Sequence, residues 1–378
     1  MNVWQQFQYF TSGRWAQIMV YLGLFMLSTA QQCADSEKSP TPQAVYTFNT
    51  PPHFGNTFKI PDDNPMTEAG IELGRMLFYE KSLSRDSSLS CATCHQQSRA
   101  FTDGRAKSIG IWGQRLTRSS MSLVNLLWVD KFFWDGRAGS LEEQAVIPLT
   151  DPREMDMNME EVVRRLQYSG LYPPYFKKAF GTDQINPQLV VKALGQFQRT
   201  LISANSRYDR IVKGEVKPTV QELRAINLFM THPVPEINLR GGNCGDCHGS
   251  HLTTLNTFHN NGLDSIPKDP GLARISRDHQ DLGRMRAPSL RNIALTAPYM
   301  HDGRFKTLEE VLEHYNEHIQ RSAYLDPLIM EATNEPNGQT LMLTEEEKKD
   351  LVLFMHLLTD SSFVQDARFA NPFVEKKN

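Results

Sequence analysis

The sequence has little that would favour a nucleic acid, a membrane interior or a large sheet. Lysine and arginine number 40 against 43 aspartates and glutamates, and neither sign forms a long run in the 378 residues. Because a polyanion partner requires a strongly basic surface, no nucleic-acid partner is expected. Long alternations of polar and apolar residues are also absent, which argues against an extended β-sheet.

Cysteine is scarce, and its placement is informative. Four of the five cysteines fall into two CxxCH motifs, so no pair remains for a structural disulfide. In CxxCH the two thiols lie about one helical turn apart and can form thioethers with one haem, while the histidine meets the iron. A zinc site would need ligands from two motifs 153 positions apart, and a thioredoxin-like dithiol needs a βαβ setting that is not found. The motifs predict two covalently bound haem c groups, attached through Cys91, Cys94 and His95 and through Cys244, Cys247 and His248.

No apolar run near the N-terminus is long enough for a convincing membrane span. Residues 1–33 combine a polar start, a short apolar run and small residues, which is typical of a secretory signal peptide. Cys33 fits either a lipid-modified terminus, as in a lipoprotein, or an ordinary cysteine in a loose segment. Residues 34–54, rich in Pro, Ser and Thr, predict a linker. We expect a periplasmic protein, soluble or tethered to a membrane through Cys33, because bacterial c-type haems are attached outside the cytoplasm.

An internal repeat with a constant offset of 167 positions links the two halves. The matching stretches are 122–125 with 289–292, 134–137 with 301–304, and 141–143 with 308–310. Apolar residues at helical spacing predict helices over 142–147, 159–166, 190–201, 220–230, 308–318 and 345–358. The expected fold is mainly α, with two cytochrome c-like haem domains related by internal duplication. We place these domains at 55–204 and 205–378.

Further motifs accompany the two CxxCH sites, at residues 133–137, 141–144, 152–155 and 298–303. With them the chain resembles the bacterial di-haem cytochrome c peroxidases and the related methylamine-utilisation protein MauG over roughly residues 55–360. This resemblance implies an N-terminal haem that reacts with hydrogen peroxide, with His95 as its ligand. It also implies a C-terminal haem, held by His248, that passes electrons.

The resemblance also implies roles for individual side chains. Gln144 and Glu154 match the glutamine and glutamate on the open face of the peroxide-reacting haem, where a carboxylate can relay a proton between the peroxide oxygens. Trp134 matches a tryptophan between the haems, although most tryptophans are simply core anchors. Arg137 and Arg304, each in a DGR turn, would pair with haem propionates.

Two positions depart from the usual peroxidase pattern. Where typical enzymes carry a histidine that blocks the catalytic iron, this chain has Ile111, so the catalytic haem is expected to be open at rest. The sixth ligand of the C-terminal haem, usually methionine, falls on Tyr315 by the motif count, as in MauG, and a tyrosinate lowers the potential. His314, His318 and Met300 lie close enough in sequence to remain alternatives.

The family also places a calcium ion between the haems. The carbonyl ligands match Thr296 and Pro298, whereas the asparagine ligand is replaced by Ser119. Because a hydroxyl binds calcium more weakly than an amide carbonyl, the sequence favours calcium only narrowly.

Three functions fit these residues. The first is reduction of hydrogen peroxide with electrons from a small cytochrome or cupredoxin. The second is MauG-like oxidation of a side chain on a protein substrate. The third is a non-catalytic di-haem electron carrier, against which Gln144 and Glu154 argue. The oligomeric state stays open, with a homodimer among the options.

Overall fold

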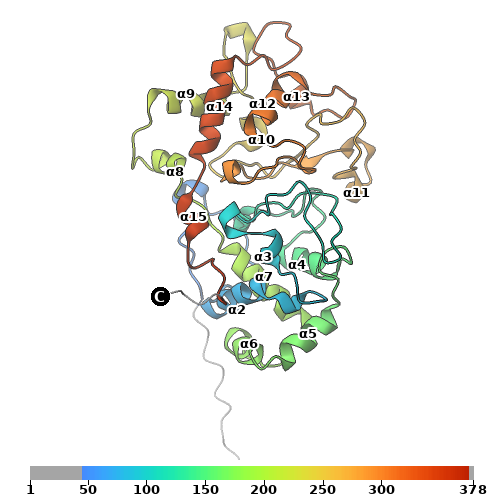
Figure 1. The fold of residues 1–378 in the computed structure, drawn as a ribbon. Coiled ribbons are helices and arrows are strands. Elements are labelled where there is room, and N and C mark those ends of the chain that lie inside the picture. The colour runs from blue at the N-terminus through green and yellow to red at the C-terminus, as the bar shows by residue number, and fades with distance from the viewer. Residues whose placement is uncertain (1–44, 374–378) are drawn as a thin grey trace, which may run out of the picture. The chain divides into compact units, whose positions relative to one another are not determined.

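Helices carry most of the regular structure in residues 45–373, the part of the chain that the computed structural model describes (Figure 1). The helices of the first half are α2 (Glu68–Tyr79), α3 (Cys91–Cys94), α4 (Leu141–Thr150), α5 (Met159–Tyr168), α6 (Tyr172–Phe180) and α7 (Pro187–Arg199). Those of the second half are α8 (Arg207–Val212), α9 (Val220–Met230), α10 (Gly245–His248), α11 (Ala273–Ser276), α12 (Leu308–Glu317), α13 (Pro327–Met330), α14 (Glu345–Leu357) and α15 (Ser361–Gln365). The one sheet among the described residues pairs β1 (Phe258–His259) with β2 (Met285–Arg286).

The mainly helical architecture is thus confirmed, and all six predicted helices are present. The helices that periodicity did not reveal are two longer ones, α2 and α6, and the short α3, α8, α10, α11, α13 and α15. The predicted signal peptide, most of the linker and Cys33 lie outside the described residues. Within residues 45–373, no helix is both long and apolar enough to cross a membrane.

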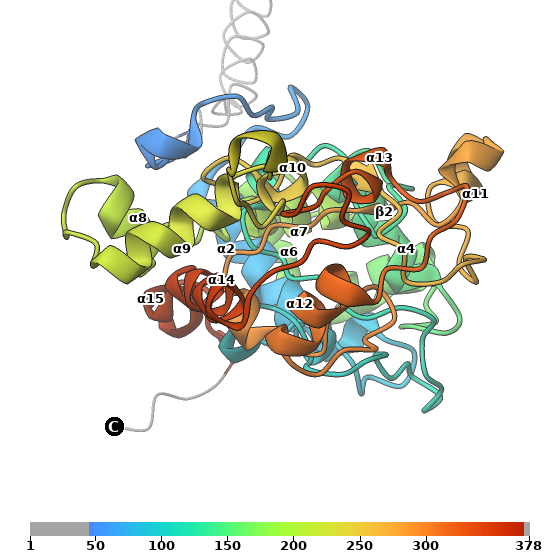
Figure 2. The ribbon, with the colours of Figure 1, turned by 90° about the horizontal axis from the view of Figure 1, so that it is seen from above.

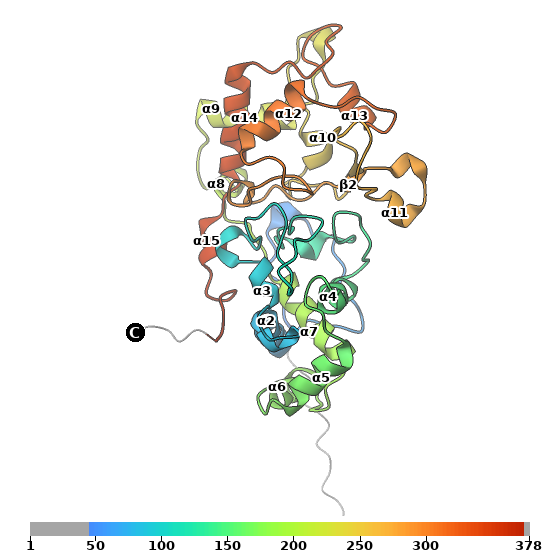
Figure 3. The ribbon, with the colours of Figure 1, turned by 45° about the vertical axis from the view of Figure 1, so that its right-hand side comes forward.

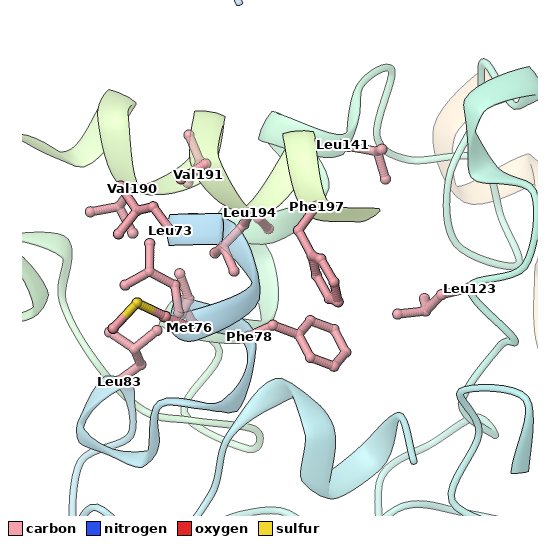
Figure 4. Packing of buried hydrophobic residues seen from close by; sticks show 14 of the residues in the cluster. Leu73, Met76, Phe78, Leu83, Leu123, Leu141, Val190, Val191, Leu194 and Phe197 are labelled. Carbon is pink, nitrogen blue, oxygen red and sulfur yellow. The ribbon is translucent and has the colours of Figure 1, made fainter. Parts of the chain in front are cut away.

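The first hydrophobic core is organised by the crossing of α2 and α7, whose apolar side chains Figure 4 shows facing each other. Two glycines on α2 allow this crossing. A Cβ on Gly74 would lie 1.9 Å from the carbonyl oxygen of Ala193, and one on Gly70 would lie 2.1 Å from Oε1 of Gln196. Only glycine lets the two backbones come this close. The resulting core supports the segment that carries the first CxxCH motif.

A second core forms around α9, α12 and α14, helices that Figure 2 labels in the view from above. It includes Tyr208, Phe229 and Phe354. After α14, the C-terminal segment leaves the second half, and α15 lies against the first half (Figure 3). Phe363 and Phe369 pack there in the first core. Two cores fit two domains, while the boundary near residue 204 stays a prediction.

The two DGR turns pack reciprocally across the halves. Gly136, with φ of 72°, lies against the ring of Phe258, and a Cβ there would come within 2.5 Å of the ring. Gly303, with φ of 66°, lies against Ala106, and a Cβ there would come within 2.3 Å of its Cα. Both positions need glycine for the left-handed backbone and for the close approach. Each half therefore receives a turn from the other half.

A buried arginine adds charge pairing to this interlock. Arg118, which is 10% exposed, binds Asp269 of the second half with Nε and Nη2, both at 2.8 Å. Its Nη1 lies 2.7 Å from the fully buried carboxylate of Asp135. The guanidinium holds the pKa of Asp269 down at about 2, although burial alone would raise it. Arg118 thus joins the first DGR turn to the segment around Asp269 in the second half.

We expect Gly136→Ala to lower the free energy of unfolding by about 3 kcal/mol, because the added Cβ meets Phe258 and is strained at positive φ. Gly170→Ala is the matched control, since Gly170 has the same φ of 72° but a Cβ on it would have no other atom within 4 Å. The control should lose only about 1 kcal/mol. Denaturant unfolding of both variants measures the difference, and equal losses would refute the reciprocal packing.

We expect Arg118→Met to cost about 3 kcal/mol at neutral pH, because Asp269 loses its ion-pair partner and the fully buried Asp135 keeps only Arg137. The depressed pKa of Asp269 means that the pair stabilises the fold fully above about pH 4, and progressively less as the pH falls toward 2. The loss caused by the substitution should therefore shrink over that window. Arg85→Met, which removes an exposed arginine 3.6 Å from Asp156, should change unfolding little. A loss independent of acid pH would contradict this account.

Candidate functional site

The first CxxCH motif forms a short helix that fixes the direction of its histidine. A capping box between Ser90 and Thr93 starts α3, and His95 ends it. Nδ1 of His95 lies 2.8 Å from the carbonyl oxygen of Phe101, whose φ of 62° turns the carbonyl toward the ring. This bond assigns the proton to Nδ1 and leaves Nε2 free as a ligand. Burial lowers the pKa of His95, which favours the neutral imidazole needed for metal binding.

The second motif repeats this arrangement on α10. Nδ1 of His248 lies 3.1 Å from the carbonyl oxygen of Pro288 and 3.4 Å from that of Thr253. Burial lowers the pKa of His248 to about 4, so its free Nε2 carries a lone pair at neutral pH. Cys244 and Cys247 lie on the short helical turn that ends at this histidine, as Cys91 and Cys94 do before His95 in the first half. Both motifs therefore offer what a c-type haem requires.

A cavity of about 260 Å³ opens beside the second motif. Its lining is largely apolar and comes from both halves, and it includes Cys244, Cys247 and His248 of the second half and Trp134 of the first. A large flat cofactor with an apolar ring fits such a lining. Residues of both halves therefore form the wall of this cavity.

Tyr315 of α12 lines this cavity, and its hydroxyl accepts a hydrogen bond from Nδ2 of Asn261 at 3.0 Å. Burial raises the pKa of this hydroxyl. The neighbouring His314 does not line the cavity, since its Nε2 lies 2.9 Å from the carbonyl oxygen of Asn261. His318 is exposed at the end of the helix, whereas Met300 lines the same cavity. The fold therefore leaves Tyr315 and Met300 as the two candidates that face the cavity.

The residues expected over the first haem come from two loops and a helix. The amide of Ile111 donates to the carbonyl oxygen of Glu154 at 3.0 Å, which brings the two segments together. Burial, aided by Asp151, raises the pKa of Glu154. The carboxylate also contributes to the raised pKa values of the Cys91 and Cys94 thiols, so it lies within electrostatic reach of the first motif.

Gln144 lies half-buried on α4, and its side-chain amide makes no hydrogen bond to another described residue. It is therefore not committed to a structural contact among residues 45–373. An amide in this state can donate to or accept from a bound polar molecule.

Trp134 lies where the two halves meet. Its Nε1 donates to the carbonyl oxygen of Ser119 at 3.0 Å, and the Ser119 hydroxyl donates to the carbonyl oxygen of Met300 at 2.9 Å. Its ring lies edge-on to that of His301, with centroids 6.5 Å apart. Trp134 thus contacts both repeats directly.

The arginines of the DGR turns are held by carboxylates. Nη1 of Arg137 lies 3.0 Å from Asp135, and its guanidinium stacks 3.6 Å from the centroid of the Phe133 ring. Arg304 pairs with Asp302 at 2.7 Å and with Asp264 at 3.0 Å. Any propionate bound there would join an existing ion pair.

The three residues predicted around calcium, Ser119, Thr296 and Pro298, all line the cavity beside the second motif. Residues 45–373 contain no cluster of three or more His, Cys, Asp or Glu side chains suited to a metal ion. A cation here would thus depend on carbonyl and hydroxyl oxygens, and the Ser119 hydroxyl already bonds to Met300.

Sequence reasoning missed three residues that shape the site: Arg118, Asn261 and Arg286. Arg118 connects the DGR turn to the opposite half, and Asn261 holds the Tyr315 hydroxyl. Arg286 is buried in the cavity wall. No motif in the sequence singles these residues out, because their roles depend on contacts between distant segments.

Comparison with known proteins agrees with these features. A family model described as di-haem cytochrome c peroxidase matches residues 68–217. The methylamine utilization protein MauG of Methylophilus methylotrophus is 34% identical over 322 residues, covering 83% of this chain and 90% of its own length. The cytochrome c551 peroxidase of Nitrosomonas europaea is 33% identical over 247 residues, covering 64% and 71%.

A solved structure is similar over nearly the same extent. The crystal structure of a MauG-like protein associated with microbial copper homeostasis has a TM-score of 0.79 and 35% identity, and the match covers 87% of this chain and 100% of that one. The chain belongs to the family of di-haem cytochrome c peroxidases and MauG proteins, which are haem-dependent oxidoreductases.

Proposed function

We propose that the protein is an exported di-haem peroxidase that reduces hydrogen peroxide with electrons from a small cytochrome or cupredoxin. One observation carries this proposal: Glu154, a partly buried carboxyl group with a raised pKa, is joined through its backbone to Ile111 near the first CxxCH motif. An electron carrier gains nothing from an acid–base group there. Perturbed carboxyl groups in such settings are typical of catalytic sites.

In this proposal each CxxCH motif binds one haem c covalently, with His95 and His248 as iron ligands. When bound, the first haem supplies the iron at which peroxide is reduced. The same left-handed backbone at Asn125 and Asn292, at Phe133 and Met300, and at Gly136 and Gly303 supports two cytochrome c-like domains that arose by duplication. These pairs keep the offset of 167 positions.

Glu154 and Gln144 would act on the peroxide itself. Breaking the O–O bond heterolytically requires a proton to leave the inner oxygen and reach the outer one. The carboxylate of Glu154 takes that proton and returns it to the leaving oxygen, which departs as water. The uncommitted amide of Gln144 would orient the peroxide by hydrogen bonds. Because Ile111 cannot bind iron, this face would be open without prior reduction of the protein.

Tyr315 is our choice for the sixth ligand at the second haem. It faces the same cavity as His248, and Asn261 holds its hydroxyl there. The bond from Asn261 favours the ionised hydroxyl, in opposition to burial. His314 is committed to a backbone carbonyl instead.

Electrons would pass between the haems through Trp134, which contacts both repeats. Arg137 and Arg304, each already paired with an aspartate, would also pair with haem propionates. Calcium between the haems, held by Ser119, Thr296 and Pro298, remains part of the proposal, as do the periplasmic location and a tether through Cys33.

A second function is favoured by two residues. Ile111 and Tyr315 depart from the peroxidase pattern in the same direction as MauG, and MauG proteins are among the relatives. Under this alternative, peroxide-dependent oxidation would reach a side chain of a docked protein. Rapid peroxide consumption that needs a protein substrate, and not a reduced cytochrome or cupredoxin, would favour the alternative over the main proposal.

We expect Glu154→Gln to slow peroxide reduction by about 10²–10⁴-fold, because the proton relay is lost. The wild-type rate should fall as the pH drops through the raised pKa of Glu154, since the base must be ionised. The variant should lose this pH dependence. Stopped-flow measurements with peroxide provide the test, with Glu160→Gln, an exposed change on α5, as the control. A variant with the wild-type rate and pH profile would rule out Glu154 as the base.

We expect Tyr315→Phe to raise the midpoint potential of the C-terminal haem and to change its electronic spectrum, because an oxygen ligand is removed. Tyr299→Phe is the matched control, since Tyr299 lines the same cavity and donates to the carbonyl oxygen of Ile293 at 3.2 Å. Spectropotentiometry of the purified holoproteins distinguishes the two. If both variants keep the wild-type spectrum and potential, Met300 becomes the better candidate.

A further inference from the structure

Arg286 is the most deeply buried cation in the wall of the cavity beside His248. It lies on β2, opposite Phe258, and its side chain is almost fully enclosed, with the residue 4% exposed. Its amide donates to the carbonyl oxygen of Trp134 at 2.8 Å, which fixes the strand against the interlocked region. The residue lines the same cavity as Tyr315.

The guanidinium of Arg286 has no carboxylate partner among the described residues. Its hydrogen bonds are long, 3.4 Å from Nε to the carbonyl oxygen of Phe133 and 3.7 Å from Nη2 to the sulfur of Met121. Burial lowers the pKa of Arg286 to about 10, and the charge of Asp130, which forms no ion pair with it, opposes this shift. A buried cation of this kind is strongly unfavourable unless an anion joins it.

Among the described residues, the other buried arginines each have a carboxylate partner, which Arg286 lacks. Arg199 and Arg291 are the two other arginines of residues 45–373 that are at most 5% exposed. Arg199 pairs with Glu142 at 2.7 Å, and Arg291 pairs with Asp209 at 2.5 Å. Arg286 differs from them in facing a cavity and lacking a carboxylate. The protein thus places an uncompensated positive charge where a ligand would be.

We infer that Arg286 binds a propionate carboxylate of the haem attached at Cys244 and Cys247, and this inference rests on the haem assignment in the proposed function. A guanidinium can bind a carboxylate with two parallel hydrogen bonds. The DGR arginines differ, because aspartates already occupy them. Arg286 would be the specific counter-ion, and it would keep that propionate ionised.

This pairing predicts how the second haem responds to pH. An ionised propionate beside a fixed guanidinium does not titrate near neutrality, so it adds no pH dependence to the midpoint potential. Without the guanidinium, the buried propionate would have a raised pKa and would bind a proton as the pH falls. Since its negative charge favours ferric iron, protonation would raise the potential.

The test uses the di-haem holoprotein with Arg286→Met and Arg286→Lys. Arg284→Met is the matched control, because Arg284 pairs with Asp281 at 3.4 Å and does not line the cavity. Mass spectrometry and the pyridine haemochrome spectrum count the attached haems. Potentiometric titration from pH 5.5 to 8.5 then gives the midpoint potential of each haem.

We expect Arg286→Met to lower the potential of the C-terminal haem at pH 8.5 and to make it rise as the pH falls. Arg286→Lys and Arg284→Met should keep the wild-type profile. If the Arg286→Met protein holds two haems and its midpoint potentials depend on pH as in the wild type, the inference about Arg286 is wrong and the proposed function is unaffected. Wild-type protein with no haem at Cys244 and Cys247 would instead defeat the proposed cofactor assignment.

Failure of Arg286→Met to assemble is also informative. In that case Arg286→Gln and Arg286→Lys are compared for haem content. Haem retained by the lysine variant and lost by the glutamine variant would support a requirement for charge. Equal loss in both variants would show that Arg286 serves only packing, which would overturn the inference.

Discussion

The reciprocal packing of two glycine turns is the constraint on which the rest of this structure depends. Gly136 fits against Phe258 of the second half, and Gly303 fits against Ala106 of the first. Each turn leaves no room for a Cβ and adopts a backbone that other residues avoid. Because the turns lie directly beside Trp134 and His301, this packing sets the contact between the halves. The cavity wall, with residues from both halves, follows from it.

Within this frame, backbone carbonyls decide how the histidines are presented. His95 and His248 each direct Nδ1 to a carbonyl oxygen, and so leave Nε2 for iron. Two arginines near the contact between the halves differ in whether a carboxylate pairs with them. Arg118 neutralises the buried Asp135, while Arg286 is left uncompensated at the cavity. In the proposed holoprotein, the two histidines would therefore bind iron, and Arg286 would pair with a haem propionate.

Much of this could be predicted from the sequence, because the relevant signals are local. Periodicity predicted a helix over 308–318, which is present as α12 (Leu308–Glu317), and the two CxxCH motifs predicted the haem sites. The sequence analysis did not predict α2, in which Gly70 and Gly74 lower the helix propensity and are explained only by the crossing with α7. The sequence spacing could not show that Tyr315 faces the cavity and its neighbour His314 does not, because this depends on how α12 packs. Arg286 carries no local signal at all.

The most direct test of the central claim, an open peroxide-reacting haem beside Glu154, is the electron paramagnetic resonance spectrum of the resting di-ferric holoprotein. The account predicts one high-spin signal from the haem at His95, since Ile111 offers no ligand, and one low-spin signal from the haem at His248. Addition of stoichiometric peroxide without reductant should then diminish the high-spin signal rapidly. Two low-spin signals, with no response until one haem is reduced, would contradict the account.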